Sequence, residues 1–468
     1  MQQLPVYVTE EEQREQERAA AAVLALPERP QTFHIVTYGC QMNAHDSEKL
    51  AGLLLSMGMT EAADRRSADF VLFNTCCVRD NAERRALGNV TWLKELKKEK
   101  PGLLIGVCGC MVQQPQMAER ILKQYRFVDL AFGTHNLHRL PQLMLTLLTR
   151  KSRVVSLSDQ ESLIAEGLPV KRLTPWHAYI TIMYGCDNFC SYCIVPYVRG
   201  RERSRKAADI LREAERLAEA GVQEIMLLGQ NVNSYGAGLP EGESFPALLR
   251  ALDGVGIPRI RFMTSHPKDL SDDLIDVMAS SRHICNHLHL PAQSGSDEIL
   301  RQMNRRYTRE EYLRKVEKLR SADPDIGLTT DLIVSFPGET ESQFEDTCSL
   351  VREVGFDAAF TFIYSPREGT RAASMPGRIP EEESTRRIER LIAEVEASAS
   401  RVHHGMVGKR ELVLAEGLSK RDNAKVSGKG TRNVTVTFDG SSEDIGKIVP
   451  VTITSAAANT LRGERTER

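Results

Sequence analysis

The stretch AYITIMYGCDNFCSYC, residues 178–193, decides the fold of this chain. A mostly apolar run typical of a buried strand passes through one glycine into a loop that carries Cys186, Cys190 and Cys193. Thiolates are soft ligands that select zinc or iron–sulfur clusters. The loop has neither the paired knuckles of a structural zinc site nor the cysteine–proline ending of a bacterial ferredoxin run. Three thiolates on a four-iron cluster would leave one iron open, so the loop predicts a cluster that binds a substrate.

The same strand begins an alternating series of strands and helices. Charged helical segments separate the further candidate strands, which are QEIMLLG (223–229), RIRFMT (259–264), HLHL (287–290), LTTDLIV (328–334) and AAFTFIY (358–364). Six strand–helix units are too few for a closed eight-stranded barrel. We therefore predict a partial (β/α)6 barrel, with its chemistry at the C-terminal ends of the strands.

A second series precedes the barrel, and each of its strand candidates ends in cysteine. These candidates are FHIVTYGC (33–40), DFVLFNTCC (69–77) and LLIGVCGC (103–110). Strands that alternate with helices predict a parallel sheet, and the carboxyl ends of parallel strands lie on one edge. Three thiols that are far apart in sequence are thus expected to meet, namely Cys40, Cys76 and Cys110.

Composition limits the class of protein. The 468 residues contain 41% hydrophobic residues, which is ordinary for a globular chain of several domains. The 10 cysteines sit in clusters in a long chain, which favours reduced thiols and a cytoplasmic protein over a secreted disulfide framework. No segment approaches the length of a membrane span, so we expect no membrane partner.

The domain organisation follows from these patterns and from the residue composition of the N-terminal and C-terminal segments. We expect an α/β chain with an N-terminal extension (1–30), a parallel-sheet domain (31–150), a linker (151–175) and the partial barrel (176–403). Short strands with Gly and Asp turns then predict a small all-β barrel at 404–468. The extension reads as a solvated helix, and a partner-docking arm is the alternative.

Motifs throughout the chain resemble those of the methylthiotransferase family of radical S-adenosylmethionine enzymes. Within that family the chain is most similar to the tRNA-2-methylthio-N6-dimethylallyladenosine synthases. The resemblance covers residues 32–463. The motifs that carry it are TYGCQMNAHDSE (37–48), FNTCCVRDNAE (73–83), GVCGCMVQQ (106–114), MYGCDNFCSYCIVPYVRGRERSR (183–205), LLGQNVNSYG (227–236), HLHLPAQSGSDEIL (287–300), MNRRYTREEY (303–312), DLIVSFPGET (331–340) and YSPREGT (364–370).

The resemblance implies two four-iron four-sulfur clusters and S-adenosylmethionine as cofactors. It makes the cysteines of the 186–193 loop the catalytic ligands of one cluster, whose open iron binds the amino and carboxylate groups of the cofactor. Cys40, Cys76 and Cys110 would hold the second cluster, which carries the sulfur to be inserted. The roles of Cys77 and Cys108, which adjoin these positions, are left open.

Five further residues are implied to bind the cofactor. Tyr192 offers an aromatic face for adenine, and loop packing is its alternative role. Gly229 and Gln230 end the second barrel strand, where the superfamily binds the amino group. Gln293 and Asp331 are polar groups at or in apolar strands, and a structural role remains open for both. Ser335 departs from the family pattern, which usually has glycine there.

Two basic segments are candidates for RNA binding in a chain whose net charge is only −2. The first, RGRERSRK (199–206), follows the cysteine loop, and the second lies in the terminal barrel, which resembles the RNA-binding TRAM barrel. A solvated helix start is the alternative for the first segment. The candidate phosphate-binding residues are Arg199, Arg201, Arg203, Arg205 and Arg432.

The resemblance implies an enzyme that inserts a methylthio group at C2 of N6-isopentenyl-adenosine at position 37 of tRNA. S-adenosylmethionine would both methylate the sulfur and yield the radical that abstracts the hydrogen. The expected partners are a tRNA anticodon stem-loop and an electron donor such as a flavodoxin or ferredoxin, with the protein as a monomer. The alternatives are a methylthiotransferase for threonylcarbamoyl-adenosine tRNA or a ribosomal protein, and an RNA-binding iron–sulfur electron-transfer or sensor protein.

Overall fold

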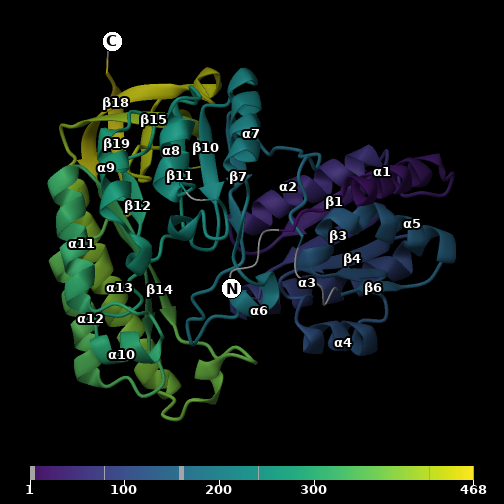
Figure 1. Cartoon of the computed structure of the whole chain (residues 1–468), viewed down its shortest axis with the longest axis horizontal. Helices are drawn as coiled ribbons and strands as arrows, with labels where there is room; N and C mark the ends of the chain where they lie inside the picture. Colours follow the sequence, from purple (N-terminus) through teal and green to yellow (C-terminus); the bar gives the residue numbers. More distant parts are fainter. Residues whose placement is uncertain (1–5, 78–79, 158–162, 241, 421, 467–468) are drawn as a thin grey trace. The chain divides into compact units, whose positions relative to one another are not determined.

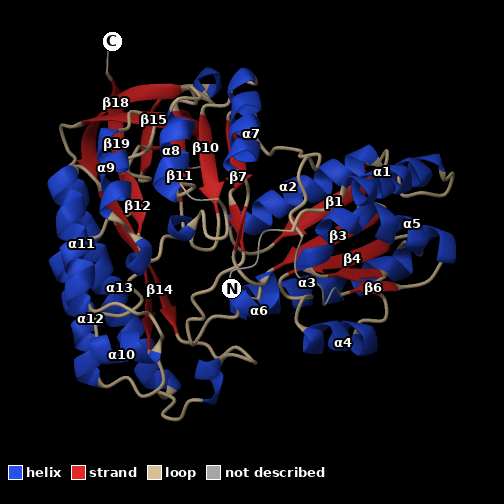
Figure 2. Ribbon diagram, in the orientation of Figure 1, coloured by secondary structure: helices blue, strands red, loops and turns tan. Residues whose placement is uncertain are grey.

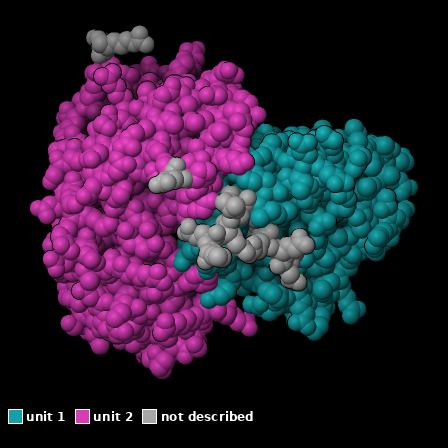
Figure 3. Space-filling view, in the orientation of Figure 1, with its two compact units in different colours: residues 1–173, 184–187, 193–205 teal, residues 174–183, 188–192, 206–468 magenta. Residues whose placement is uncertain are grey.

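The computed structural model describes residues 6–77, 80–157, 163–240, 242–420 and 422–466 (Figure 1). Parts of the predicted N-terminal extension, linker and terminal barrel, at residues 1–5, 158–162, 421 and 467–468, lie outside the described residues. Contacts divide the chain into two compact units, which Figure 3 draws in teal and magenta. Unit 1 comprises residues 1–173, 184–187 and 193–205, and unit 2 comprises residues 174–183, 188–192 and 206–468.

Unit 1 is built on a parallel sheet that helices cover on both faces (Figure 2). Its order in the described residues is β2(Thr60–Glu61), β1(Thr32–Thr37), β3(Phe70–Thr75), β4(Leu104–Gly109), β5(Leu130–Phe132) and β6(Val154–Ser156). Strand β3 is buried throughout, as expected for a central strand of a doubly covered sheet. Its alternate residues enter two separate cores, Phe70 and Leu72 in one and Val71 and Phe73 in the other. The helices are α1(Glu10–Ala25), α2(Gln41–Ser56), α3(Asp80–Glu99), α4(Pro115–Gln124), α5(Leu140–Arg150) and α6(Val195–Arg199).

The predictions of β1, β3 and β4 are confirmed, but the short strands β2, β5 and β6 were missed. Strand β6 lies inside the predicted linker 151–175, and that part of the prediction is wrong because Val154–Ser156 pairs in parallel with β5. Three-residue strands carry too little alternation to be recognised in a sequence. Helix α1 is also not a solvated extension, because it packs against α5 and buries Ala19, Ala20 and Val23.

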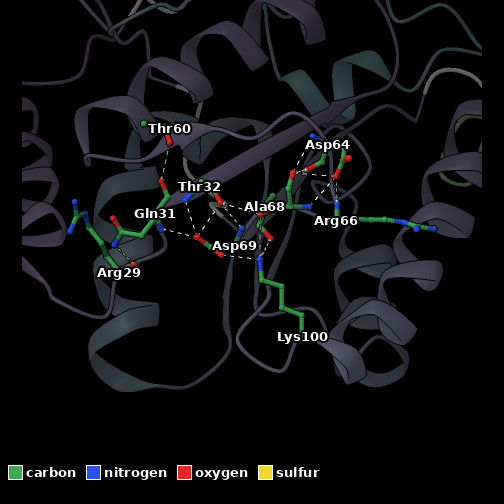
Figure 4. A network of polar contacts seen from close by, with 10 residues as sticks. Arg29, Gln31, Thr32, Thr60, Asp64, Arg66, Ala68, Asp69 and Lys100 are labelled. Carbon is green, nitrogen blue, oxygen red and sulfur yellow. Dashed lines mark hydrogen bonds and ion pairs between the residues drawn. The ribbon is translucent and has the colours of Figure 1, made fainter.

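A polar network joins the starts of β1 and β3 (Figure 4). The Asp69 carboxylate accepts hydrogen bonds from the backbone N–H groups of Gln31 (3.0 Å) and Thr32 (3.1 Å) and from the Thr32 hydroxyl (3.0 Å). The Lys100 ammonium group lies 2.9 Å from the same carboxylate. The network fixes the register of the two strands whose opposite ends carry Cys40 and Cys76.

The predicted partial barrel is confirmed in unit 2. Its described strands form two parallel sheets, ordered β11-β10-β7 and β12-β13-β14, and a parallel bridge between Ile260 and Ile284 connects β11 with the segment before β12. The strands are β7(His177–Thr181), β10(Glu224–Leu228), β11(Arg259–Phe262), β12(His287–His289), β13(Gly327–Val334) and β14(Ala358–Ile363). The helices are α7(Ala207–Glu219), α8(Phe245–Asp253), α9(Asp272–Ser280), α10(Asp297–Gln302), α11(Arg309–Ala322), α12(Glu341–Val354) and α13(Glu381–His404). The short strands β8(Met183–Tyr184) and β9(Arg203–Ser204) flank the cysteine loop in sequence.

The C-terminal strands close into a barrel, as predicted. The order in the described residues is β15(Arg410–Ser419), β16(Asp422–Lys429), β17(Thr435–Asp439), β19(Thr460–Arg465) and β18(Ile448–Ala456). The pairs are antiparallel except for β17 and β19, which run in parallel. Val426, Val436, Phe438 and Val451 fill the barrel interior.

Buried arginines fasten this barrel to the rest of unit 2. Arg261 of β11 pairs with Glu224 (2.7 Å) and donates to the backbone carbonyl of Thr431 (3.1 Å). Arg259 donates to the carbonyl of Lys429 at 2.9 Å. Arg432 of the barrel binds Asp357 through both carboxylate oxygens, at 2.7 and 3.0 Å. The barrel is therefore docked by charge-assisted hydrogen bonds, in addition to its own apolar core.

In the described residues, no helix combines the length and the apolar character needed to span a bilayer.

Candidate active site and thiol sites

Strained backbone gathers at the carboxyl ends of the partial barrel's strands. Thr264 follows β11 with φ of +68°, Gln293 follows β12 with φ of +68°, and Ser335 follows β13 with φ of +59°. A side chain in the left-handed region costs about 1–2 kcal/mol, and such strain collects at functional sites. The family's usual glycine at position 335 is explained by this φ. The strand ends, where chemistry was expected, are the strained part of the barrel.

Gly229 ends β10 at a place that accepts no side chain. A Cβ atom there would lie 2.5 Å from Cγ of Met183. The Gly229 carbonyl also accepts a hydrogen bond from the Thr264 hydroxyl at 2.7 Å. Gln230 follows directly and is half-buried. Thr264 is a polar neighbour of this position that the sequence did not reveal.

Gln293 and Asp331 lie together, as the sequence suggested. The Gln293 N–H donates to the Asp331 carbonyl (2.8 Å), and the Gln293 carbonyl accepts from Ile333 N–H (2.9 Å). The Asp331 side chain is 29% exposed and lies 3.6 Å from Nε2 of His289. Phe360 pairs with Asp331 in the register of β13 and β14 and is 51% exposed. An accessible carboxylate and an aromatic ring therefore occupy neighbouring positions on these strands.

Arg305 contacts the cysteine loop and was missed by the sequence analysis. Its guanidinium lies 3.4 Å from Sγ of Cys190 and donates to the Pro291 carbonyl (2.8 Å) and the Tyr307 hydroxyl (3.1 Å). The side chain is almost fully buried, and burial raises the pKa of the neighbouring Tyr307 hydroxyl. A guanidinium in this position can balance part of the negative charge of a metal–thiolate centre. Arg305 lies in the family motif MNRRY, but nothing in that motif indicates that this arginine contacts Cys190.

Hydrogen bonds hold the central part of the loop in place. Ser191 donates through its N–H to the Met303 carbonyl (3.0 Å) and through its hydroxyl to the Gln302 carbonyl (2.8 Å). Phe189 has φ of +45°, and its carbonyl accepts from the Asn304 side chain at 3.0 Å. Tyr192 packs against an apolar cluster that includes Phe336, so loop packing accounts for at least part of its role.

The loop belongs to both units, and all its thiols are reduced. Cys186 and Cys193 are assigned to unit 1 and Cys190 to unit 2. Each of the three thiols is partly exposed. In unit 2, Cys190 is a soft and partly exposed sulfur donor beside an arginine, which fits a ligand of an iron–sulfur cluster.

The second set of thiols lies at the carboxyl ends of β1, β3 and β4 in unit 1. Gly39 has φ of +119°, and a Cβ atom on it would lie 2.6 Å from Cβ of Cys76. Cys40 follows immediately, and its thiol donates to Oδ1 of Asn43 (3.6 Å). Asn43 in turn donates to the Thr75 carbonyl at 3.0 Å. The strands thus bring Cys40 and Cys76 to one edge, as the sequence predicted.

Cys110 lies against Cys77 and Arg199. The Cys77 thiol donates to Cys110, and this hydrogen bond together with Arg199 lowers the pKa of Cys110, although burial opposes the shift. Arg199 itself is held by Oδ2 of Asp46 (2.9 Å) and Oδ1 of Asn43 (3.2 Å). A guanidinium beside a thiol suits the negative charge of a thiolate or of a bound sulfur.

No three His, Cys, Asp or Glu side chains in the described residues converge as ligands of a single metal ion. A four-iron cluster makes a different demand, because each cysteine binds its own iron. Cysteines from separate strand ends with one arginine nearby fit that demand. Cys76 and Cys110 are buried while Cys40 is exposed, so the edge opens on the side of Cys40.

The prediction of a basic strip for RNA is wrong for most of its residues. Arg199 is buried against Asp46, and Arg203 is buried and donates to the carbonyls of residues 199 and 201. Arg205 is buried against Glu166, and Arg432 is bound to Asp357. These side chains satisfy the protein's own acceptors and leave little surface for phosphate. Arg201 remains 62% exposed, 3.2 Å from Asp187.

Comparisons with known proteins agree with this architecture. Residues 180–351 match the Radical SAM superfamily, residues 32–133 match Uncharacterized protein family UPF0004, and residues 405–465 match the TRAM domain. The solved structure of the radical S-adenosylmethionine methyltransferase TsrM from Kitasatospora setae, with cobalamin and a 4Fe–4S cluster bound, aligns with a TM-score of 0.53 at 15% identity. That alignment covers 73% of this chain and 77% of the other, and it shows a shared fold.

Curated relatives are much more similar. The tRNA-2-methylthio-N(6)-dimethylallyladenosine synthase of Caldicellulosiruptor saccharolyticus is 52% identical over 434 residues, which is 92% of each chain. The enzyme of the same name from Thermoanaerobacter sp. is 49% identical over 464 residues, covering 99% of this chain and 98% of the relative. The chain therefore belongs to the family of tRNA-2-methylthio-N(6)-dimethylallyladenosine synthases, within the radical SAM superfamily.

Proposed function

We propose that this protein inserts a methylthio group at C2 of N6-isopentenyl-adenosine at position 37 of tRNA. The observation that carries the proposal is the identity of about half of all residues, over nearly the whole chain, to synthases of that name. The chain has two separate sets of cysteines, one in the 186–193 loop and one at the ends of β1, β3 and β4. The reaction needs two such sites, one to generate a radical and one to hold sulfur.

We propose Cys186, Cys190 and Cys193 as ligands of the radical cluster, and Cys40, Cys76 and Cys110 as ligands of the sulfur-carrying cluster. A three-cysteine cluster with S-adenosylmethionine supplies reductive cleavage of the cofactor and hence hydrogen abstraction. Arg305 lies beside Cys190 and Arg199 beside Cys110, so a guanidinium accompanies each set of cysteines and can balance part of the negative charge of a bound cluster.

The remaining strand-end residues are proposed to bind the cofactor and the target base. Gly229 allows close approach of the cofactor's amino group, and Gln230, Gln293 and Asp331 offer it polar partners. Tyr192, one residue before the last cysteine, is proposed to offer its ring to the adenine of the cofactor. Water must be excluded from this site because a carbon radical would be quenched.

We further propose that residues 31–150, 176–403 and 404–468 act as the sulfur-carrying, radical and RNA-binding domains. The TRAM match supports RNA as a partner, and the target is proposed to be the anticodon stem-loop. Radical SAM chemistry requires a reductant, for which a flavodoxin or a ferredoxin is the proposed donor. We propose a cytoplasmic monomer.

Two triple variants test the assignment of the cysteine sets. The Cys186→Ala, Cys190→Ala, Cys193→Ala variant should form no 5′-deoxyadenosine when it is incubated with dithionite and S-adenosylmethionine. The Cys40→Ala, Cys76→Ala, Cys110→Ala variant should still form it, but should give no methylthio product. Cys348→Ala, at a buried helix position in α12, is the matched control and should retain both activities. Formation of 5′-deoxyadenosine by the first variant would refute the assignment.

A further inference from the structure

A small cavity in unit 1 lies beside the Cys110 site and shares Arg199 with it. Its volume is about 60 Å³, and its lining includes Lys49, Thr134, His135, Tyr184 and Arg203. A cavity needs roughly 10–15 Å³ to hold one water molecule. The space is therefore large enough for a small ion with its hydrogen-bond partners, but too small for a nucleotide.

Lys49 is a buried cation on this lining, and no acidic side chain of the described residues forms an ion pair with it. Its side chain is 9% exposed. Among the described residues its ammonium group contacts the Tyr184 hydroxyl (3.4 Å) and lies 5.8 Å from the centre of the Tyr184 ring, with no carboxylate within 4.0 Å. The carboxylate of Glu48, one position earlier, instead forms hydrogen bonds with the His45 ring (3.1 Å) and the Leu173 N–H (3.0 Å). A buried charge without a counterion is costly, so an anion beside Lys49 would be stabilising.

The other charged groups around the cavity add to this excess of positive charge. Arg199 and Arg203 line it, and the only carboxylate among its described lining residues, Asp46, is already bound to Arg199 at 2.9 Å. Burial, with Arg203 and Arg199, lowers the pKa of His135 to about 4. The lining at neutral pH thus carries three cations and one carboxylate, a net charge of +2, while the Thr134 hydroxyl donates to the Val198 carbonyl at 2.7 Å.

We propose that this cavity binds a small inorganic oxyanion of the phosphate and sulfate class. Lys49 supplies a charge that no carboxylate of the described residues neutralises, and Arg199 and Arg203, whose hydrogen bonds go largely to the protein itself, add positive charge to the lining. Because the lining cations are nine-tenths buried, the structure favours a free anion over a phosphate group of an RNA backbone. The cavity adjoins the proposed Cys110 cluster site through Arg199, but Lys49 belongs to neither proposed cluster site, and the proposal does not depend on the reaction.

Calorimetric titration with inorganic phosphate tests the proposal on the full-length protein. The wild type should bind one phosphate per chain, and Lys49→Met should bind it at least tenfold more weakly. Lys94→Met, at an exposed position of α3, is the matched control and should bind as the wild type does. Ala165→Leu provides a second variant, because it fills the cavity without removing a charge, and it should also abolish binding.

Thermal unfolding gives an independent measurement. Phosphate should raise the melting temperature of the wild type and of Lys94→Met, because a ligand that binds only the folded state stabilises it, but not that of Lys49→Met or Ala165→Leu. Absence of saturable phosphate binding, or equal binding by Ala165→Leu and the wild type, would overturn the proposal. Displacement of bound phosphate by a tRNA anticodon stem-loop would overturn the assignment to a free anion.

Discussion

Replacing Arg432 with methionine distinguishes two roles for this residue, namely docking the terminal barrel through Asp357 and binding an RNA phosphate. The sequence alone did not distinguish them. In the structure the Arg432 guanidinium makes three hydrogen bonds to Asp357, at 2.7 to 3.0 Å, and Asp357 is 2% exposed. Removing one partner of a buried ion pair costs about 3–5 kcal/mol, because the other charge is left buried. Asp357 would keep only the Leu328 N–H (2.9 Å) as a hydrogen-bond donor among the described residues, so a loss in this range is expected.

The chain offers a local reporter for this measurement. A Cβ atom on Gly446 of the barrel would lie 2.9 Å from the indole ring of Trp176, so this tryptophan packs against the barrel within unit 2. The chain contains 2 tryptophans, and a Trp92→Phe background leaves Trp176 as the sole fluorophore. Urea unfolding followed at Trp176 should show the destabilisation for Arg432→Met, and a smaller one for Arg432→Lys, which loses the bidentate geometry.

The contrasting outcome is defined by RNA binding. If Arg432 were instead exposed and bound one RNA phosphate, its replacement would lower the slope of log affinity against log salt concentration by about one. It would leave the free energy of unfolding within about 0.5 kcal/mol of the wild type. Lys420→Met, at an exposed position of the same barrel, serves as the stability control. An unchanged Trp176 transition together with a reduced salt slope for Arg432→Met would refute the docking role.

Three further predictions follow from the sites. Reconstituted protein should hold about eight irons in two four-iron clusters, and the Cys40→Ala, Cys76→Ala, Cys110→Ala variant should retain half of them; loss of all iron would contradict independent clusters. Because burial holds the folded pKa of His135 at about 4, below its unfolded value, its contribution to stability is complete above about pH 6.5 and is lost as the pH falls towards 4. The free energy of unfolding, measured with urea in phosphate-free buffer, should therefore fall over that range, with His135 contributing at most about 1.4 kcal/mol per pH unit, and His135→Asn should reduce the slope by that contribution. Ser335→Gly should raise stability by up to about 1 kcal/mol in thermal unfolding, since it relieves a left-handed backbone at φ of +59°; a loss would mean that the serine side chain matters more than the strain.

The sequence was sufficient to predict the main architecture because two signals agreed, namely the alternation of strands with helices and the placement of cysteines after the strands. Cysteines at three strand ends and a fourth strand that leads into the 186–193 loop predicted both the parallel sheet and the place where thiols gather. Burial of β3 on both faces and the order of the sheet bear this out. The short strands β2, β5 and β6 could not be predicted, because two or three residues carry no measurable alternation.

The arginines show where sequence reasoning fails. A run of basic residues next to the cysteine loop has the composition of a phosphate-binding strip, yet Arg199 finds Asp46, which is 153 positions away. Charge pattern reports local composition, whereas burial depends on partners brought together by the fold. The same limit hid Arg305, whose contact with Cys190 spans 115 positions.

The most direct test of the proposed function is mass spectrometry of nucleosides from tRNA that contains N6-isopentenyl-adenosine but lacks the 2-methylthio group. The tRNA would be incubated anaerobically with the reconstituted protein, a sulfur source, S-adenosylmethionine and a reductant. The account predicts conversion to 2-methylthio-N6-isopentenyl-adenosine, with formation of 5′-deoxyadenosine. Absence of that product, with methylthiolation of threonylcarbamoyl-adenosine tRNA or of a ribosomal protein by the same preparation, would contradict it.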